Sequence, residues 1–471
     1  MKASARGFIV RASQSGATNA LLLLVSLAST LIFPKLLGVG DYSFWQLYVF
    51  YVGYVGVMQF GWNDGIYLRY GGHLYGQLER SRFAVQFWLL VATQVVIGVV
   101  VVLAAWVLVP DADRAFILAM TGVATLVLGT RAFFFFVWQA TNLIGHYARA
   151  LALEQVVFIT AVTIWFLTGG TGYHGLILCD LLAKSVSLVV SVYWCRDLVI
   201  ERVHAKKADL SEAWLNVSVG IKLMLANLAS MLVVGVVRFA IERHWDVVTF
   251  GKVSLSLSVS SLVMVFVNAV GVVVFPTLRR IDPARKPELF LTLRTLYLPI
   301  AAVLLMLYFP LRIGLGLWLP DYAESLRYLG LLFPVFVFEG RMALLINSFL
   351  KDLREERSML LVNLGGVGLS VVLSVICAFW LGSLELTVGS IIVLIVVRAT
   401  VAELVLSRRL GVWALASLLP ELGLTAVFVC SAWFLPVGPA LATYAACYVG
   451  FLALSWPRLR SAGRVAAGLV R

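Results

Sequence analysis

Long apolar stretches follow one another along almost the whole chain, with short polar connections between them. A helix needs about 20 mostly apolar residues to cross a membrane, because the hydrocarbon core is roughly 30 Å thick. The pattern therefore predicts an all-α integral membrane protein with about fourteen transmembrane helices. The expected spans are 17–37, 41–62, 84–109, 115–139, 149–169, 173–194, 219–239, 247–276, 295–319, 328–349, 358–381, 386–407, 413–435 and 439–457.

The amino-acid composition also indicates that the chain lies in a membrane. Hydrophobic residues make up 61% of the 471 positions and charged residues only 13%, so a water-soluble fold would leave too much apolar surface exposed. No connection is long enough to fold as a soluble domain. The longest connection, 195–217, is polar and mixed in charge.

The distribution of basic residues predicts the orientation of the chain. The sequence has 37 Lys and Arg and a formal net charge of +13, and cytoplasmic loops retain an excess of such residues. If the N-terminus is inside, the outer loops hold little more than Arg114, Arg243 and Arg327. Both termini are thus expected in the cytoplasm. Because this topology explains the charge, we expect no nucleic-acid partner.

Familiar catalytic and ligand-binding motifs are missing from the sequence. Phosphate-binding loops, nucleotide fingerprints and hydrolase signatures do not occur. The cysteines are isolated, without the spacing of a zinc site or a disulfide framework. We therefore expect no enzyme activity, no cofactor, no metal site and no catalytic residue. The cysteines are Cys179, Cys195, Cys377, Cys430 and Cys447.

One short segment, GWNDGIYLRYGG at 61–72, is unusually polar and rich in glycine. Glycine, asparagine and aspartate favour tight turns, so the segment is expected to end a helix and begin a connector. A plain connector, with Arg69 contributing to the inside charge, is the simpler interpretation. The alternative is an entrance for an anionic lipid headgroup. In that case Gly65, Gly71 and Gly72 allow close approach of the backbone and Arg69 attracts the phosphates.

Several charged residues fall within the expected spans, where an ionised side chain costs about 2.5 to 3.5 kcal/mol at the centre of a helix. Such residues face a protein interior or a water-filled space. Basic residues outnumber acidic ones. The basic residues are Lys35, Arg131, Lys184, Arg238, Lys252, Arg312, Arg341 and Arg398, and the acidic residues are Glu154, Asp180, Glu339 and Glu403.

Two pairs of opposite charge follow from local geometry. Asp180 and Lys184 are four residues apart and share a helix face. Arg131 lies late in one expected helix and Glu154 early in the next, so the two lie at similar depth. Both pairs are expected to have mainly structural roles.

The remaining intramembrane cations have no local partner. Arg341 is two residues from Glu339, about 200° around the helix, so the two cannot face each other. Arg398 has no acid nearby on its own helix. One interpretation is a cationic lining that binds a diphosphate, for which arginine forks are well suited. The other is that Arg341 and Arg398 snorkel or pair with carboxylates of other helices.

The candidate sites are therefore of three kinds. The expected cargo-binding residues are Arg341, Arg398, Lys184, Lys252 and Arg131. The expected entrance residues are Arg69, Gly65, Gly71 and Gly72. The acids that could couple transport to an ion are Glu154, Asp180 and Glu339, because protonation of a buried carboxylate changes its interaction with a nearby cation.

The two halves of the chain resemble each other weakly. PKLLGVGDYSFWQLY carries Lys35, a turn and an aromatic residue that opens the next span, and VRFAIERHWDVVTFGKVSLSL repeats this order with Arg238. The tripeptide LAS precedes each cation, at 27–29 and 228–230. Internal repeats of this kind are typical of secondary transporters.

A family resemblance rests on the basic N-terminus, the turn LLGVGDYSFWQ with its repeat WDVVTFGKVSL, the segment GWNDGIYLRYGG, the ending VVVFPTLRR and the fourteen-helix plan. In these features the chain resembles Wzx-type flippases, the oligosaccharide-lipid branch of the multidrug/oligosaccharidyl-lipid/polysaccharide exporter superfamily. It departs from them at the first turn, where Asp41 stands alone although relatives often have several acids.

The resemblance implies two six-helix lobes, 1–200 and 201–410, arranged as an inverted V around a cationic cavity. An extra helix pair with a basic tail follows at 411–471. It further implies a flippase of the bacterial cytoplasmic membrane. Such a protein moves undecaprenyl-diphosphate-linked oligosaccharide to the periplasmic leaflet for O-antigen, lipopolysaccharide or other surface polysaccharide synthesis. The partners it implies are the lipid-linked oligosaccharide, membrane lipids and a polysaccharide polymerase machinery.

Two other functions stay open. A multidrug or small-molecule exporter of the same superfamily shares the two-lobe plan, but ordinarily has twelve helices and an anionic cavity. A polytopic glycosyltransferase or polymerase needs a sizeable outer loop for donor and acceptor, and the outer connections here are short.

Overall fold

The computed structural model describes residues 21–201, 207–278, 282–412 and 418–470, and the regular structure within these residues is helical. A helix over Leu21–Leu31 precedes α2. The helices are α2 (Phe33–Gly53), α3 (Trp62–Tyr70), α4 (Arg80–Leu108), α5 (Ala112–Ala140), α6 (Ile144–Leu167), α7 (Tyr173–Trp194), α8 (Arg196–Val199), α9 (Lys207–His244), α10 (Val247–Leu278), α11 (Lys286–Leu305), α12 (Tyr308–Trp318), α13 (Ala323–Leu332), α14 (Val335–Arg341), α15 (Asn347–Asp352), α16 (Glu356–Ser374), α17 (Leu384–Leu410), α18 (Leu418–Phe434) and α19 (Val437–Val470). Short 3-10 turns η1 (Val55–Gln59), η2 (Tyr75–Gln77), η3 (Pro283–Arg285) and η4 (Pro320–Tyr322) and π-helical turns η5 (Met342–Ile346) and η6 (Val375–Trp380) connect or extend them.

The described residues contain ten helices that are long and apolar enough to cross a membrane, or twelve if two bent pairs each count as one span. The all-α membrane fold expected from the sequence is confirmed. The difference from fourteen has two sources. The first two expected spans meet within one bent pair, Leu21–Leu31 and Phe33–Gln59, and the thirteenth corresponds to the shorter helix Leu418–Phe434.

Gly38 marks a kink inside α2, between the first two expected spans. Its φ of 73° and ψ of 177° interrupt α2, and glycine adopts positive φ without the steric cost of a Cβ. A second break follows at Phe60 and Gly61, which are both left-handed. The segment 61–72 therefore differs from the expected turn, because most of it forms the helix α3 and the connector begins only at Gly71.

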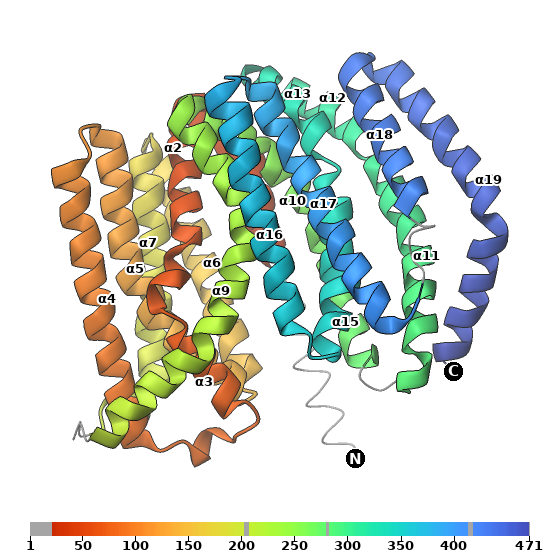
Figure 1. The fold of residues 1–471 in the computed structure, drawn as a ribbon. Helices are drawn as coiled ribbons and strands as arrows, with labels where there is room; N and C mark the ends of the chain where they lie inside the picture. The colour runs from red at the N-terminus through yellow and green to blue at the C-terminus, as the bar shows by residue number, and fades with distance from the viewer. Residues whose placement is uncertain (1–20, 202–206, 279–281, 413–417, 471) are drawn as a thin grey trace. The chain divides into compact units, whose positions relative to one another are not determined.

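The chain divides into two compact units, Met1–Leu228 and Ala229–Arg471, and α9 continues from one into the other. In the first unit α4 packs on α5 and α6 on α7, while α2 contacts both α5 and α7 (Figure 1). Its core is aromatic, and Phe83, Phe133, Phe134 and Trp138 are almost fully buried.

In the second unit α16 packs on α17, and α10 contacts both α13 and α14 (Figure 1). The last two helices pair with each other, and both contact α11. Two tyrosines reinforce this packing, because Tyr444 and Tyr448 of α19 donate to the carbonyl oxygens of Ala302 and Pro299 on α11.

Candidate functional site: paired charges on the helices

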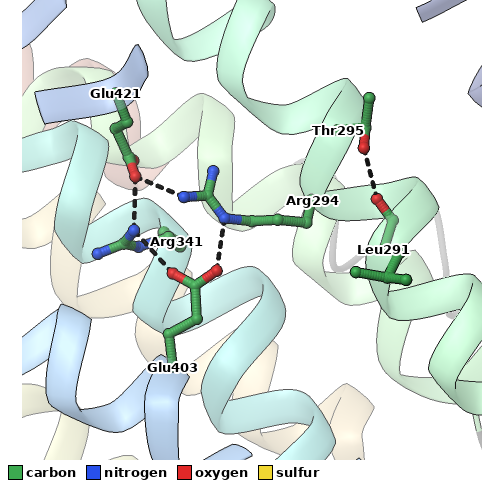
Figure 2. Close-up of polar contacts among 6 residues, drawn as sticks. All are labelled: Leu291, Arg294, Thr295, Arg341, Glu403 and Glu421. Carbon is green, nitrogen blue, oxygen red and sulfur yellow. Dashed lines mark hydrogen bonds and ion pairs between the residues drawn. The ribbon is translucent and has the colours of Figure 1, made fainter. Parts of the chain in front are cut away.

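Four charged side chains meet in the interior of the second unit, each from a different helix. Arg294 of α11 binds Glu403 of α17 at 2.7 Å and Glu421 of α18 at 2.6 Å. Arg341 of α14 binds the same two carboxylates, with 2.8 Å to Glu403 (Figure 2). All four side chains are at most 1% exposed. We call this group the buried quartet.

The buried quartet is balanced in formal charge but incompletely hydrogen-bonded. Nη1 of Arg294, Nε and Nη2 of Arg341 and Oε1 of Glu421 are buried without a hydrogen-bond partner among the described residues. Removing one member of such a group leaves an uncompensated buried charge, which is strongly destabilising. The closed packing indicates a structural contribution.

The sequence left two interpretations of Arg341 open, and the structure has the paired one, because Glu403 and Glu421 neutralise Arg341 from helices far along the chain. Cargo binding by Arg341 stays a prediction. Arg294 lies one residue before the expected span 295–319, but α11 begins nine residues before that span, at Lys286, and carries Arg294 into the interior. Glu421 was not expected in this group.

A second pair in the same unit is more accessible. Nη2 of Arg398 donates to both oxygens of Glu339, at 2.6 and 2.7 Å. Nη1 of Arg398 lies 3.3 Å from the carbonyl and hydroxyl oxygens of Ser230. The Arg398 side chain is 2% exposed and that of Glu339 is 29% exposed. Arg398 is therefore also paired, but the carboxylate of Glu339 that pairs with it is accessible to solvent or to a ligand.

The first unit contains the two pairs expected from local geometry, and both are confirmed. Arg131 binds Glu154 between α5 and α6, and Lys184 binds Asp180 along α7. Tyr48 of α2 donates its hydroxyl to the same Asp180 oxygen at 2.7 Å. The four charged side chains are between 9% and 14% exposed.

Lys252 also has an unexpected partner. Its ammonium lies 2.5 Å from Glu324 of α13, a carboxylate that is 56% exposed. All five cations expected to bind cargo are therefore paired with carboxylates. The sequence left Arg341, Arg398 and Lys252 without a local partner, and distant helices supply the acids that pair with them. Cargo binding by the five cations stays a prediction.

The glycines of 61–72 serve helix packing. A Cβ atom at Gly65 would lie 1.9 Å from the carbonyl oxygen of Asn216, and one at Gly61 would lie 2.4 Å from the nitrogen of Ile221. A Cβ atom at Gly220 would likewise lie 1.9 Å from the carbonyl oxygen of Gly61. The α3 and α9 backbones thus touch. Gly65 is not open to a headgroup as the entrance interpretation expected, because α9 occupies that space.

The other expected entrance residues also have local contacts. Arg69 donates to Asn216 at 2.6 Å and pairs with Glu212 at 2.8 Å, both on α9. The backbone N–H of Gly72 donates to the carbonyl oxygen of Ala140 at 2.9 Å, and its φ of 96° favours glycine. A Cβ at Gly71 would lie 2.9 Å from the Tyr67 carbonyl oxygen, which is too close without a backbone shift. Most of the segment is therefore a closely packed helix, α3, in which Arg69 has a counter-ion. Entry of a headgroup here stays a prediction.

Two titratable groups of α3 lie outside the candidate spans. Burial raises the pKa of Asp64 to about 6, and a backbone hydrogen bond opposes this shift. Burial also raises the pKa of Tyr70 to about 12, and its hydrogen bond to Glu212 acts in the same direction. Asp64 therefore changes charge near pH 6.

One cation of the spans was missed by the sequence reasoning. Lys222 lies within the expected span 219–239 and has no acid three or four residues away. The missing local partner is the signal that could have identified Lys222 as a candidate site residue. The structure places it on α9 with an exposed side chain. Within the described part of the chain no cluster of three or more His, Cys, Asp or Glu side chains could hold a metal ion.

Comparisons with known proteins identify the fold. No family model matches the sequence, and no curated protein matches it significantly. Among solved structures, the chain is similar to an inward-facing multidrug resistance MATE family transporter of the MOP superfamily. The TM-score is 0.65 at 14% identity, over 86% of this chain and 98% of the transporter. A MATE structure in complex with MaD5 matches with a TM-score of 0.53 at 13% identity, over 86% of this chain and 95% of that one.

The chain is also similar to the Lipid II flippase MurJ in an inward closed conformation. The TM-score is 0.64 at 10% identity, over 96% of this chain and 99% of the flippase. The protein therefore has the multi-pass, all-α membrane fold of MOP superfamily transporters. Its structural neighbours include both multidrug transporters and a lipid flippase.

Proposed function

We propose that the protein is a flippase for a polyprenyl-diphosphate-linked oligosaccharide. It moves this lipid from the cytoplasmic to the periplasmic leaflet of a bacterial inner membrane, by alternating access, for assembly of a surface polysaccharide such as O-antigen. The observation that carries the proposal is the extent of the structural match. The flippase likeness covers 96% of this chain, whereas the MATE transporter leaves about 66 of the 471 residues unmatched.

The C-terminal helix pair supports this choice because it is built into its unit. Glu421 of α18 is a member of the buried quartet and binds both Arg294 and Arg341. Tyr444 of α19 donates to Ala302 of α11 at 2.8 Å. Because buried charges hold α18 in place, this helix pair is an integral part of the fold, as the flippase plan of fourteen helices requires.

The pair of Arg398 and Glu339 offers a way to bind a diphosphate. The arginine already holds two carboxylate oxygens in a fork, and phosphate oxygens can take the same place. Glu339 is accessible enough to leave, and protonation of its carboxylate would weaken its hold on Arg398. Asp180 and Glu154 are the corresponding coupling acids of the first unit, where they hold Lys184 and Arg131.

A multidrug exporter is the competing function, and the MATE likeness at a TM-score of 0.65 favours it equally as a fold. The two functions differ in the charge of the cargo. An exporter of organic cations needs accessible acids, whereas a diphosphate needs accessible basic groups.

A transport assay distinguishes them. The full-length protein is reconstituted in liposomes with a fluorescent lipid-linked oligosaccharide, and the fraction reaching the outer leaflet is measured by chemical quenching. We expect quenching above that of protein-free liposomes and a loss of at least about tenfold in Arg398→Gln, because a charged hydrogen bond is removed. Accumulation of a cationic dye without lipid movement would instead identify an exporter.

A further inference from the structure

Lys222 is the one charged residue of α9 between Glu212 and Arg238. It lies within the candidate span Leu210–His244, and its side chain is exposed. Among the described residues, no carboxylate, carbonyl oxygen or aromatic ring contacts its ammonium. This distinguishes Lys222 from the five paired cations described above.

The packing of α9 directs Lys222 away from α3. Asn216 and Gly220 form the face of α9 that touches the backbone of α3. Lys222 is two residues past Gly220, about 200° around the helix. Its own face carries the apolar residues Leu215 and Leu225, which are 45% and 43% exposed. The ammonium therefore emerges from an apolar surface without an acid to neutralise it.

Trp214 indicates the depth of Lys222 in the membrane. Its indole is 72% exposed, and exposed tryptophans of membrane proteins concentrate at the headgroup level. Lys222 is eight residues further along α9, about 12 Å of helix. This distance places its Cα within the hydrocarbon half of that leaflet, where an ammonium is costly unless a polar or charged group meets it.

We infer that Lys222 binds the phosphate groups of a lipid headgroup, and, resting on the function proposed above, that this lipid is the polyprenyl diphosphate. An ammonium supplies three hydrogen-bond donors and a compact charge, which suits phosphate oxygens approached from several directions. The contact of Gly61 with Ile221 and the bond of Arg69 to Asn216 fix the turn of α9 that carries Lys222. The entrance expected at Arg69 thus lies on the neighbouring helix.

Lipid binding to the full-length protein in nanodiscs of zwitterionic lipid tests this inference. The probes are undecaprenyl diphosphate, phosphatidylglycerol and inorganic diphosphate. Lys222→Gln should weaken binding of undecaprenyl diphosphate about tenfold or more, because a charged hydrogen bond is lost. Lys222→Arg should retain most of the affinity. Lys351→Gln, which changes another exposed lysine at the end of α15, is the matched control and should bind as the wild type does.

The other outcomes have distinct meanings. Wild-type affinity in Lys222→Gln would overturn the inference and leave the proposed function intact. An equal loss for phosphatidylglycerol would also overturn it, because Lys222 would then contact bulk anionic lipid. Competition by inorganic diphosphate, absent in Lys222→Gln, would support recognition of the diphosphate itself. Failure of the wild type to bind any polyprenyl diphosphate would refute both the inference and the proposed function.

Discussion

Nη2 of Arg294 on α11 lies 2.6 Å from Oε2 of Glu421 on α18, although 127 residues separate the two in the chain. The same Glu421 oxygen accepts from Arg341, so one carboxylate of the C-terminal pair binds two arginines of the preceding helices. Both side chains are essentially inaccessible. The stability of the second unit should therefore depend on the charge balance of the buried quartet.

Replacement of Arg341 by alanine should destabilise the protein rather than merely impair transport. Glu403 and Glu421 would share Arg294 alone, and a broken buried pair costs about 3–5 kcal/mol. We expect a lower unfolding temperature of the detergent-solubilised protein and less monodisperse protein on size-exclusion chromatography. The double variant Arg341→Met with Glu421→Gln removes one charge of each sign and should recover much of the loss. A stable Arg341→Ala protein that lacks only transport would point back to cargo binding.

Replacement of Glu339 by glutamine should preserve the fold and change ligand binding. The neutral amide holds Arg398 less strongly than the carboxylate does, so the arginine becomes more available to phosphate. We expect about tenfold tighter binding of undecaprenyl diphosphate and slower flipping, measured on the same preparation. Glu385→Gln is the control, because Glu385 forms an exposed pair with Arg327 at 3.1 Å in the same unit. Unchanged binding in Glu339→Gln would remove Arg398 from the proposed cargo site.

Addition of a methyl group at Gly65 should weaken the contact between α3 and α9. The new Cβ would lie 1.9 Å from the carbonyl oxygen of Asn216, which is backbone and cannot rotate away. Overpacking of this kind costs about 1–3 kcal/mol, so Gly65→Ala should lower the unfolding temperature. Gly76→Ala is the control, since nothing lies within 4 Å of a Cβ at that position. Equal unfolding temperatures for the two variants would show that the helices separate without cost.

Asp64 should make stability depend on pH in a defined direction. Its folded pKa of about 6 exceeds the ordinary value of 3.8, so between these values the folded protein binds more protons than the unfolded chain. The free energy of unfolding therefore decreases as pH rises from about 4 to about 6. Asp64→Asn should abolish that decrease and be more stable than the wild type above pH 6, in thermal unfolding across this range. Asp321→Asn, at an exposed position, should leave the wild-type profile unchanged.

The contacts that follow from short-range periodicity could be predicted from the sequence. Asp180 and Lys184 share a face because a helix repeats every 3.6 residues, and Arg131 and Glu154 meet because consecutive helices form a hairpin. The segment 61–72 shows where such reasoning ends. Its glycines suggested a tight turn, but Gly61 and Gly65 pack against α9, which lies about 150 residues further along the chain.

The sequence by itself determined that the chain lies in a lipid bilayer and that its fold is all-α, because each apolar run inside a bilayer must satisfy its own backbone hydrogen bonds. It also determined which charges have a partner within one turn or one hairpin. Only the tertiary structure decided that Arg341 and Arg398 are neutralised and that Lys222 is not. Their carboxylate partners lie between 59 and 80 residues away on other helices, and no local period specifies which helices become neighbours.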